Sequence, residues 1–154
     1  MRAHQTSSKW INSIFCVTLM ACFLATPLAA HQGATGIVKD RMDKFSQARN
    51  QMRQMGRALQ NDQFEDIADI SAAMQIWAKD LTSYFPDGSQ TSPTEAADSV
   101  WQDKDGFAKA ASVYELSLIA LNEAALGRDR ETVISAYQKV GLACKSCHQI
   151  YRQR

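Results

Sequence analysis

The residues best suited to chemistry stand close together near the end of the chain. Cys144 and Cys147 are separated by two residues, and His148 follows the second cysteine directly. On a helix, residues three or four positions apart share a face, so these two thiols and the imidazole would crowd one side. Such thiols can form thioether bonds to a porphyrin, and an imidazole nitrogen can bind its iron. The pattern C-x-x-C-H is typical of covalent haem attachment.

Three other kinds of site also use cysteine and histidine side chains. A redox-active C-x-x-C pair normally stands at a helix start in a β-α-β context, and the sequence shows no such context. A structural zinc site needs four ligands, and beyond residue 30 only His31 could join these three side chains as a sulfur or imidazole ligand. A plain disulfide would leave His148 without a role. We therefore expect one haem c per chain, attached to Cys144 and Cys147, with His148 as an axial iron ligand.

The first 30 residues have the composition of a secretory signal peptide. Arg2 and Lys9 precede a largely apolar run from Trp10 to Leu24, and small residues lead up to Ala30. We predict cleavage after Ala30, which divides the chain into a signal peptide (1–30) and one haem domain (31–154). The apolar run is shorter than the roughly 20 residues that a membrane span needs, so no stable span is expected after cleavage.

A second interpretation of the same segment is a lipoprotein signal. Leu19-Met20-Ala21-Cys22 resembles such a signal, in which Cys22 would carry the lipid. Met20 fits that pattern poorly, and the apolar residues after Cys22 fit it worse. We therefore expect a periplasmic protein, with lipid anchoring at Cys22 as the weaker alternative.

The charge of the chain is close to balanced. It has 17 Lys and Arg against 16 Asp and Glu, and loss of Arg2 and Lys9 with the signal leaves 15 against 16, a net charge of −1. No basic block suggests nucleic-acid binding. The charge does not identify the redox partner proteins that a small haem protein would require.

Four stretches carry apolar residues at spacings of three and four, which predicts four amphipathic helices. They cover about 37–60, 63–84, 103–126 and 129 to the haem motif. Asp62 and Glu65 suggest a capping box for the second, Gly127 an end for the third, and Asp129 an N-cap for the fourth. The one long loop, 86–93, is rich in Pro, Gly and Ser. The fold class is therefore predicted as all-α, an antiparallel four-helix bundle with the haem motif on its last helix.

A haem motif on the last helix of a four-helix bundle resembles the class II cytochromes c, the family of cytochrome c prime and its low-spin relatives. The resemblance is most specific in the tail, and two shorter segments support it. These segments are Gly141-Leu142-Ala143-Cys144-Lys145-Ser146-Cys147-His148-Gln149-Ile150-Tyr151-Arg152, Phe85-Pro86-Asp87-Gly88 and Ser99-Val100-Trp101. The resemblance implies a four-helix bundle with one haem, and it also admits a homodimer.

The resemblance leaves two possibilities for the sixth iron position, which the first helix contributes. In cytochrome c prime an apolar side chain blocks the position, and the iron binds NO or CO. In the low-spin branch a methionine closes it. The segment Met52-Arg53-Gln54-Met55-Gly56-Arg57 resembles that branch, and Met52 matches its ligand. Methionine at helical spacing is also a common core residue, so Met55 and then Met42 and Met74 are weaker candidates.

Two arginines are candidates for positions beside the haem. The resemblance implies an arginine four residues before the distal residue, near a haem propionate, and Arg49 lies three before Met52. Arg152 lies four after His148 and matches an arginine that flanks the proximal ligand, where its charge would influence the imidazole.

We predict a one-electron carrier with His148 and Met52 as axial ligands. The alternative is a five-coordinate protein of the cytochrome c prime type that binds NO or CO. An enzyme is not expected, because His148 is the only histidine of the predicted domain apart from His31 at its new N-terminus, and no other catalytic cluster is visible.

Overall fold

The structure is a computed structural model that describes Met1 and residues 33–153. The predicted signal peptide, its alternative at Cys22 and the candidate terminal residue His31 lie outside the described residues. Within the described part of the chain, no helix is long and apolar enough to cross a membrane.

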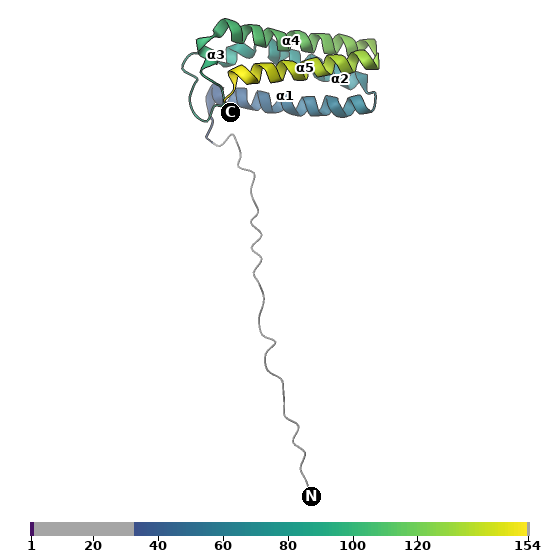
Figure 1. Ribbon diagram of the computed structural model, residues 1–154, viewed down its shortest axis with the longest axis horizontal. Coiled ribbons are helices and arrows are strands. Elements are labelled where there is room, and N and C mark those ends of the chain that lie inside the picture. The colour runs from purple at the N-terminus through teal and green to yellow at the C-terminus, as the bar shows by residue number, and fades with distance from the viewer. Residues whose placement is uncertain (2–32, 154) are drawn as a thin grey trace.

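The described chain is helical, and four long helices lie side by side as a bundle (Figure 1). The elements are α1 (Gly36–Gln60), α2 (Phe64–Lys79), the 3-10 helix η1 (Leu81–Tyr84), α3 (Ser99–Gln102), α4 (Lys104–Gly127) and α5 (Arg130–Tyr151). Connections of three residues between α1 and α2, and of two between α4 and α5, make these pairs antiparallel. The predicted all-α four-helix bundle is confirmed.

The helix ends differ in part from the predictions. Asp103 and Asp129 cap α4 and α5, because their carboxylates accept hydrogen bonds from the backbone N–H of Gly106 at 3.0 Å and Thr132 at 2.9 Å. The capping box at Asp62 is wrong. Asp62 adopts a left-handed conformation in the turn, and its carboxylate instead pairs with Arg130 of α5.

Two further boundaries depart from the expected pattern. The second predicted helix breaks at Asp80 and continues as η1, and the short helix α3 precedes α4. Gly127 is the last residue of α4, and the left-handed residue that follows is Arg128, with φ 55°. The periodicity therefore located the long helices, whereas the turn conformations depended on contacts between helices.

The packed core fills the end of the bundle where α1 turns into α2 and α4 into α5. Met55, Ile67, Leu121 and Val133 are fully buried there. Across the centre, the amide of Asn122 donates to the carbonyl of Ala68 at 2.7 Å and joins α4 to α2. The other end contains a cavity, and part of the apolar stripe predicted for α1 lines that cavity instead of the core. These stripe residues are Phe45, Ala48 and Met52.

Candidate haem site

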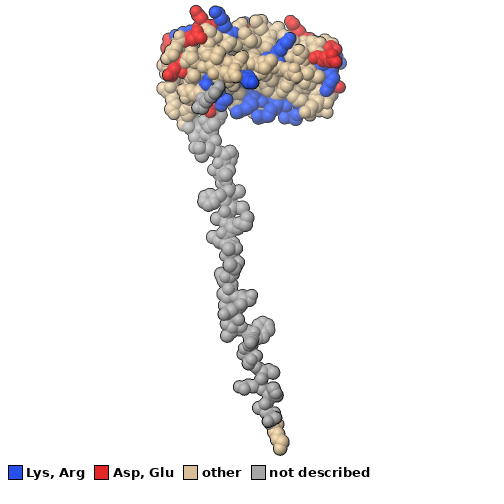
Figure 2. Space-filling view, in the orientation of Figure 1, with Lys and Arg blue, Asp and Glu red and all other residues tan. Residues whose placement is uncertain are grey.

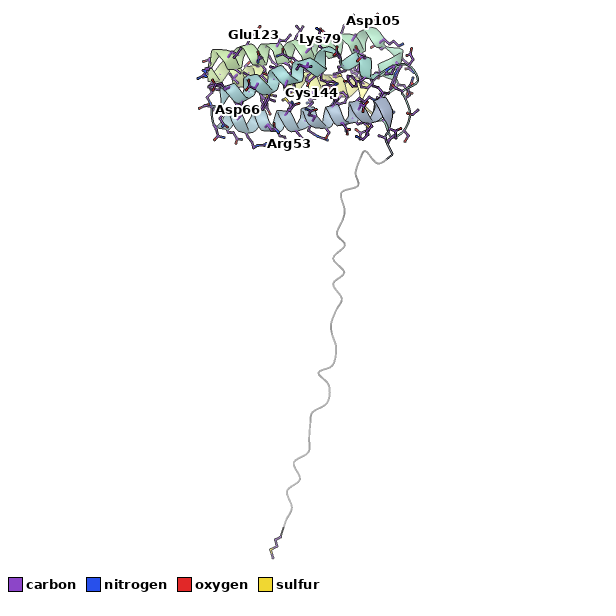
Figure 3. All side chains as sticks on the ribbon, turned by 180° about the vertical axis from the view of Figure 1, so that it is seen from behind. Arg53, Asp66, Lys79, Asp105, Glu123 and Cys144 are labelled. Carbon is purple, nitrogen blue, oxygen red and sulfur yellow. The ribbon has the colours of Figure 1, made fainter. Side chains whose placement is uncertain are left out.

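A cavity of about 500 Å³ lies between α1 and α5. Cys144, Cys147 and His148 of α5 line one side, and Phe45 and Met52 of α1 line another. Figure 3 shows Cys144 inside the bundle. The volume is in the range of cavities that hold cofactor-sized ligands, and the sequence motif lies on the wall of this cavity.

The two helices that border the cavity are tied together at its inner end. The hydroxyl of Tyr137 on α5 donates to the backbone carbonyl of Met52 at 3.0 Å. Gly56 allows this approach, since a Cβ on it would lie 2.9 Å from the Tyr137 hydroxyl oxygen. This contact closes one end of the space between α1 and α5.

Both cysteines are unpaired thiols that are partly buried beside the cavity. Burial raises the pKa of Cys144, and it raises the pKa of Cys147 to about 11. Both groups are therefore neutral near pH 7. A redox-active pair needs a lowered thiol pKa, so this environment does not favour the redox-pair interpretation.

The ring of His148 lies 6.0 Å from the ring of Phe45, measured between centroids. Burial is the main cause that lowers the pKa of His148, and the positive charge of Arg152 adds to it. A lowered pKa keeps the imidazole neutral near pH 7, with a nitrogen lone pair free for a metal. On the α1 side, the predicted iron ligand His148 thus faces the ring of Phe45.

Arg41 is a buried cation on the cavity wall that the sequence analysis did not single out. Only 2% of its surface is exposed. Its guanidinium donates to the Ser89 and Thr94 hydroxyls, both at 2.8 Å, and to the Ser89 carbonyl at 2.6 Å, and it lies 4.7 Å from the Phe85 ring centroid. It forms no ion pair with a carboxylate among the described residues. A buried charge normally has a counter-charge, so an anionic group is expected in the cavity.

The other predicted site residues lie at different depths. Met42 and Met52 line the cavity, whereas Met55 and Met74 are buried in the core. Arg49 is exposed and also lines the cavity. These positions leave two methionines of α1 within the cavity wall.

Arg152 lines the cavity and is held there by an ion pair. Its guanidinium donates to the Glu95 carboxylate at 2.5 and 2.9 Å. An antiparallel pairing holds the same segment, with Gln153 N–H donating to the Glu95 carbonyl at 2.8 Å. The loop before α3 therefore fixes the end of α5 just beyond His148.

Tyr151 provides a second link at this end of α5. Its hydroxyl donates to the Asp103 carboxylate at 2.9 Å, and its ring centroid lies 5.2 Å from that of Phe107. The residue that caps α4 thus also anchors the helix that carries the haem motif.

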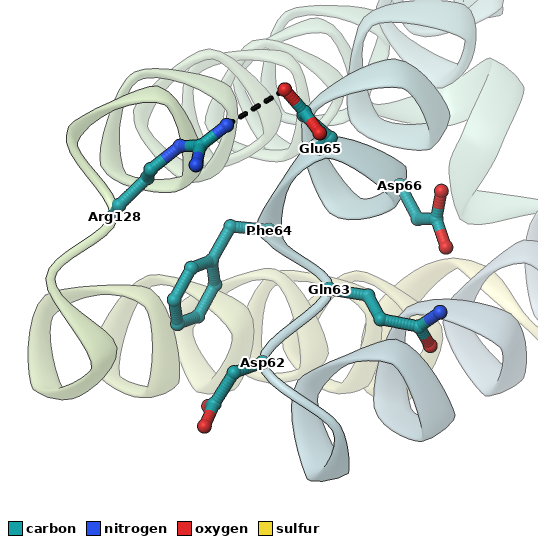
Figure 4. A pocket seen from close by; sticks show the side chains of 6 residues that line it. All are labelled: Asp62, Gln63, Phe64, Glu65, Asp66 and Arg128. Atoms are coloured by element: carbon teal, nitrogen blue, oxygen red, sulfur yellow. Dashed lines mark hydrogen bonds and ion pairs between the residues drawn. The ribbon is translucent and has the colours of Figure 1, made fainter.

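A smaller hollow of about 200 Å³ lies where α1 turns into α2 (Figure 4). It is lined by Asp62, Gln63, Phe64, Glu65, Asp66 and Arg128. The Arg128 guanidinium donates to the Glu65 carboxylate at 2.7 Å, so part of the negative charge that lines the hollow is neutralised. Among the described residues, no group of three or more His, Cys, Asp and Glu side chains could hold a metal ion. The zinc interpretation also involved His31, which lies outside the described residues.

The residues of the large cavity fit a covalently attached haem. Two free thiols and a neutral imidazole share one wall, aromatic and aliphatic side chains cover the others, and the unpaired cation of Arg41 suits a propionate. In particular, Arg41 is buried without a carboxylate partner among the described residues, and a propionate would supply the counter-charge.

Comparison with known proteins agrees with this chemistry. The model of the Cytochrome C' family matches residues 36–152. Cytochrome c' of Cereibacter sphaeroides is 31% identical over 154 residues, which covers 92% of this chain and 98% of the relative. The structure of cytochrome c' from Thermochromatium tepidum has a TM-score of 0.71 at 22% identity, covering 77% of this chain and 95% of that one. A nitric oxide complex of a cytochrome c prime variant from Alcaligenes xylosoxidans has a TM-score of 0.69 at 20% identity, covering 77% and 94%.

Proposed function

The chain belongs to the cytochrome c' family and is a c-type cytochrome with one covalently bound haem; from this premise we propose that it binds NO or CO at an iron whose only protein ligand is His148. The observation that carries the proposal is the position of Phe45, whose ring lies 6.0 Å from that of His148. A phenyl ring has no atom that can bind iron. Phe45 would therefore cover the sixth position and leave it without a protein ligand.

The spacing of Arg41 and Phe45 supports this assignment. Arg41 lies four residues before Phe45, the separation that the class II resemblance implies between the propionate arginine and the distal residue. Arg41 is also buried, and it forms no ion pair with a carboxylate of residues 33–153. We therefore propose Arg41 for the propionate contact, in place of the exposed Arg49.

Each residue then has a separate task. Cys144 and Cys147 would hold the haem by thioether bonds, and His148 would bind the iron through its neutral imidazole. An iron with one open axial position supplies the ability to bind small diatomic ligands. Phe45 would exclude water and limit the size of what reaches that position. The nitric oxide complex of the Alcaligenes xylosoxidans variant is the likeness that suggests the ligand class.

The second candidate is a one-electron carrier with Met52 as the sixth ligand. It is retained because Met52 lines the same cavity. Met52 lies seven residues beyond Phe45, which is about 10 Å along the helix at 1.5 Å per residue. Ligation by Met52 would therefore require the iron to lie about two helical turns nearer to the C-terminal end of α1 than Phe45 does. Neither candidate function includes substrate chemistry.

Optical spectra of the purified protein, recorded oxidised and reduced with and without CO, distinguish the two candidates. The proposal predicts broad high-spin bands that shift with CO, in wild type and in Met52→Leu alike. If the protein is an electron carrier with Met52 bound to the iron, the reduced spectrum should be sharp and should not change when CO is added. It should then become sensitive to CO only in Met52→Leu. Phe45→Ala is expected to speed CO binding if Phe45 covers the iron, and an unchanged rate would count against that role.

We also propose that the chain is exported to the periplasm before haem attachment. The support is the composition of residues 1–30, together with the haem motif. The mass of the purified haem protein tests this, because cleavage after Ala30 requires a chain that begins at His31. A mass that retains residues 1–30 would contradict it.

A further inference from the structure

The haem-binding helices differ in charge from the rest of the bundle. Residues 44–61, in α1 and the turn after it, contain four Lys and Arg and no acidic residue. Residues 132–153, most of which belong to α5, contain three Lys and Arg and again no acidic residue. Residues 62–103, which include α2 and the long loop, contain nine acidic residues and one lysine. A chain that is nearly neutral overall is therefore strongly polarised, with positive charge on the two helices that border the cavity.

Three of the four Lys and Arg in residues 44–61 form one row. Arg49, Arg53 and Arg57 are spaced four residues apart and are all exposed. Arg53 hydrogen-bonds to Asn50, and none of the three forms an ion pair among the described residues. Like charges four residues apart destabilise a helix by a few tenths of a kcal/mol per pair. The arginine row therefore opposes helix stability rather than supporting it.

The row begins at the haem cavity. Arg49 lines the cavity, and the next two arginines continue along the outside of α1. Figure 2 shows basic side chains gathered along the edge of the bundle that α1 forms, and Figure 3 shows Arg53 pointing outward there. A partner that binds the arginine row would therefore sit beside the cavity that holds the haem.

From this arrangement we propose that the arginine row, Arg49, Arg53 and Arg57, is the docking surface for an acidic redox protein. One electron passes between the partner's redox centre and the haem iron, so that one is oxidised as the other is reduced. Docking at this row brings the partner to the side of the molecule where Arg49 borders the cavity. Complementary charge would steer the encounter and raise its rate at low salt. The inference depends on the covalent haem and not on NO or CO binding.

A protein surface fits the row better than a lipid membrane does. A helix that lies on a membrane presents large apolar side chains beside its basic face. Among the helices, the large apolar side chains that are exposed lie on α2, α4 and α5, and α1 carries none. These exposed residues are Ile76, Val113, Leu116, Leu126, Leu142 and Ile150.

The first test measures charge near the haem with two small oxidants of opposite sign, hexacyanoferrate(III) and tris(phenanthroline)cobalt(III), acting on the reduced protein. Replacing the three arginines by glutamine should slow the anionic oxidant about tenfold at low salt and speed the cationic one. The control Lys79→Gln, Lys104→Gln, Lys109→Gln removes equal charge from exposed positions on α2 and α4. It should change neither rate by more than about twofold. Equal effects of the two triple variants would overturn the proposal.

The second test identifies the class of partner. A plant-type [2Fe–2S] ferredoxin serves as an acidic one-electron donor, and vesicles of phosphatidylglycerol and phosphatidylcholine serve as an anionic membrane. We expect the arginine variant to be reduced about tenfold more slowly by the ferredoxin than wild type or the lysine control, and wild type not to sediment with the vesicles. Equal ferredoxin rates in all three proteins would refute docking at the row. Sedimentation that is lost only in the arginine variant would assign the row to a membrane instead.

Discussion

Replacing Gly106 by alanine should destabilise the protein, although alanine is the better helix former. Gly106 lies in the first turn of α4, and a Cβ there would come within 2.5 Å of the Tyr151 hydroxyl oxygen and 2.6 Å of the Asp103 carboxyl carbon. Real Cβ contacts are not this short, so both side chains must move. Asp103 would lose its place as the cap of α4, and Tyr151 would be pushed from Phe107.

The size of the effect follows from three contributions. Loss of an N-cap costs about 1 kcal/mol. Disturbing the contact between the Tyr151 and Phe107 rings, whose centroids are 5.2 Å apart, costs about 0.5–1.5 kcal/mol. Alanine is more favourable than glycine in a helix by about 1 kcal/mol, which offsets part of these losses. The net loss is about 1 kcal/mol, which corresponds to a melting temperature lower by about 4 °C for a domain of this size.

Urea and thermal unfolding of the haem-loaded protein measure this loss. Gly127→Ala is the matched control, because Gly127 lies at the other end of the same helix and its added Cβ would meet nothing within 4 Å. That variant should be as stable as wild type or more stable. In a Tyr151→Phe background, part of the penalty of Gly106→Ala should disappear. If Gly106→Ala stabilises the protein as much as Gly127→Ala does, the steric reasoning is wrong.

Three further predictions concern single side chains. Gly56→Ala should cost about 1 kcal/mol in urea unfolding, because the added Cβ crowds the Tyr137 hydroxyl and breaks its hydrogen bond to α1; the cost should fall in a Tyr137→Phe background. Tyr114→Phe should leave the unfolding free energy unchanged or raise it, since the buried hydroxyl has no partner among the described residues; a loss above about 1 kcal/mol would show that it has one. The side-chain hydrogen bond from Thr132 lowers the pKa of Asp129, so the stability gained from the ionised cap is present above its ordinary pKa of about 3.9 and is lost as the pH falls through the lowered value. Unfolding of wild type and Asp129→Ala from pH 6 to pH 2.5 should therefore show a difference that shrinks at acid pH, and a constant difference would contradict this.

The sequence was sufficient to predict the long helices and the nature of the site. The three- and four-residue apolar spacing defines the bundle, and the haem motif needs only neighbouring positions on one helix. These features are local, so they can be recognised without knowledge of how distant segments meet.

The distal side depends instead on how α1 lies against α5. Phe45, Ala48 and Met52 share one stripe, and periodicity alone does not show which turn of α1 faces His148. The segment that resembles the low-spin branch favours the turn of α1 that contains Met52, whereas the structure places the ring of Phe45 beside that of His148. Met52 as iron ligand stays a prediction that the CO spectra test.

Arg41 was missed for a related reason. A single arginine on an amphipathic helix normally faces solvent, and its burial here comes from the loop that supplies Ser89 and Thr94. The four-residue spacing from Arg41 to Phe45 was present in the sequence. That spacing does not by itself show that both residues lie on the cavity wall, because this depends on how α1 packs against the loop and α5.

The cavity between α1 and α5 has a consequence for how the protein matures. On one flank α1 packs against α2, and on the other it faces the cavity of about 500 Å³. Helices with few apolar contacts open locally at low free-energy cost. Bound haem would fill this space and add apolar contacts to α1, so haem supply should set how much of a newly made chain survives proteolysis.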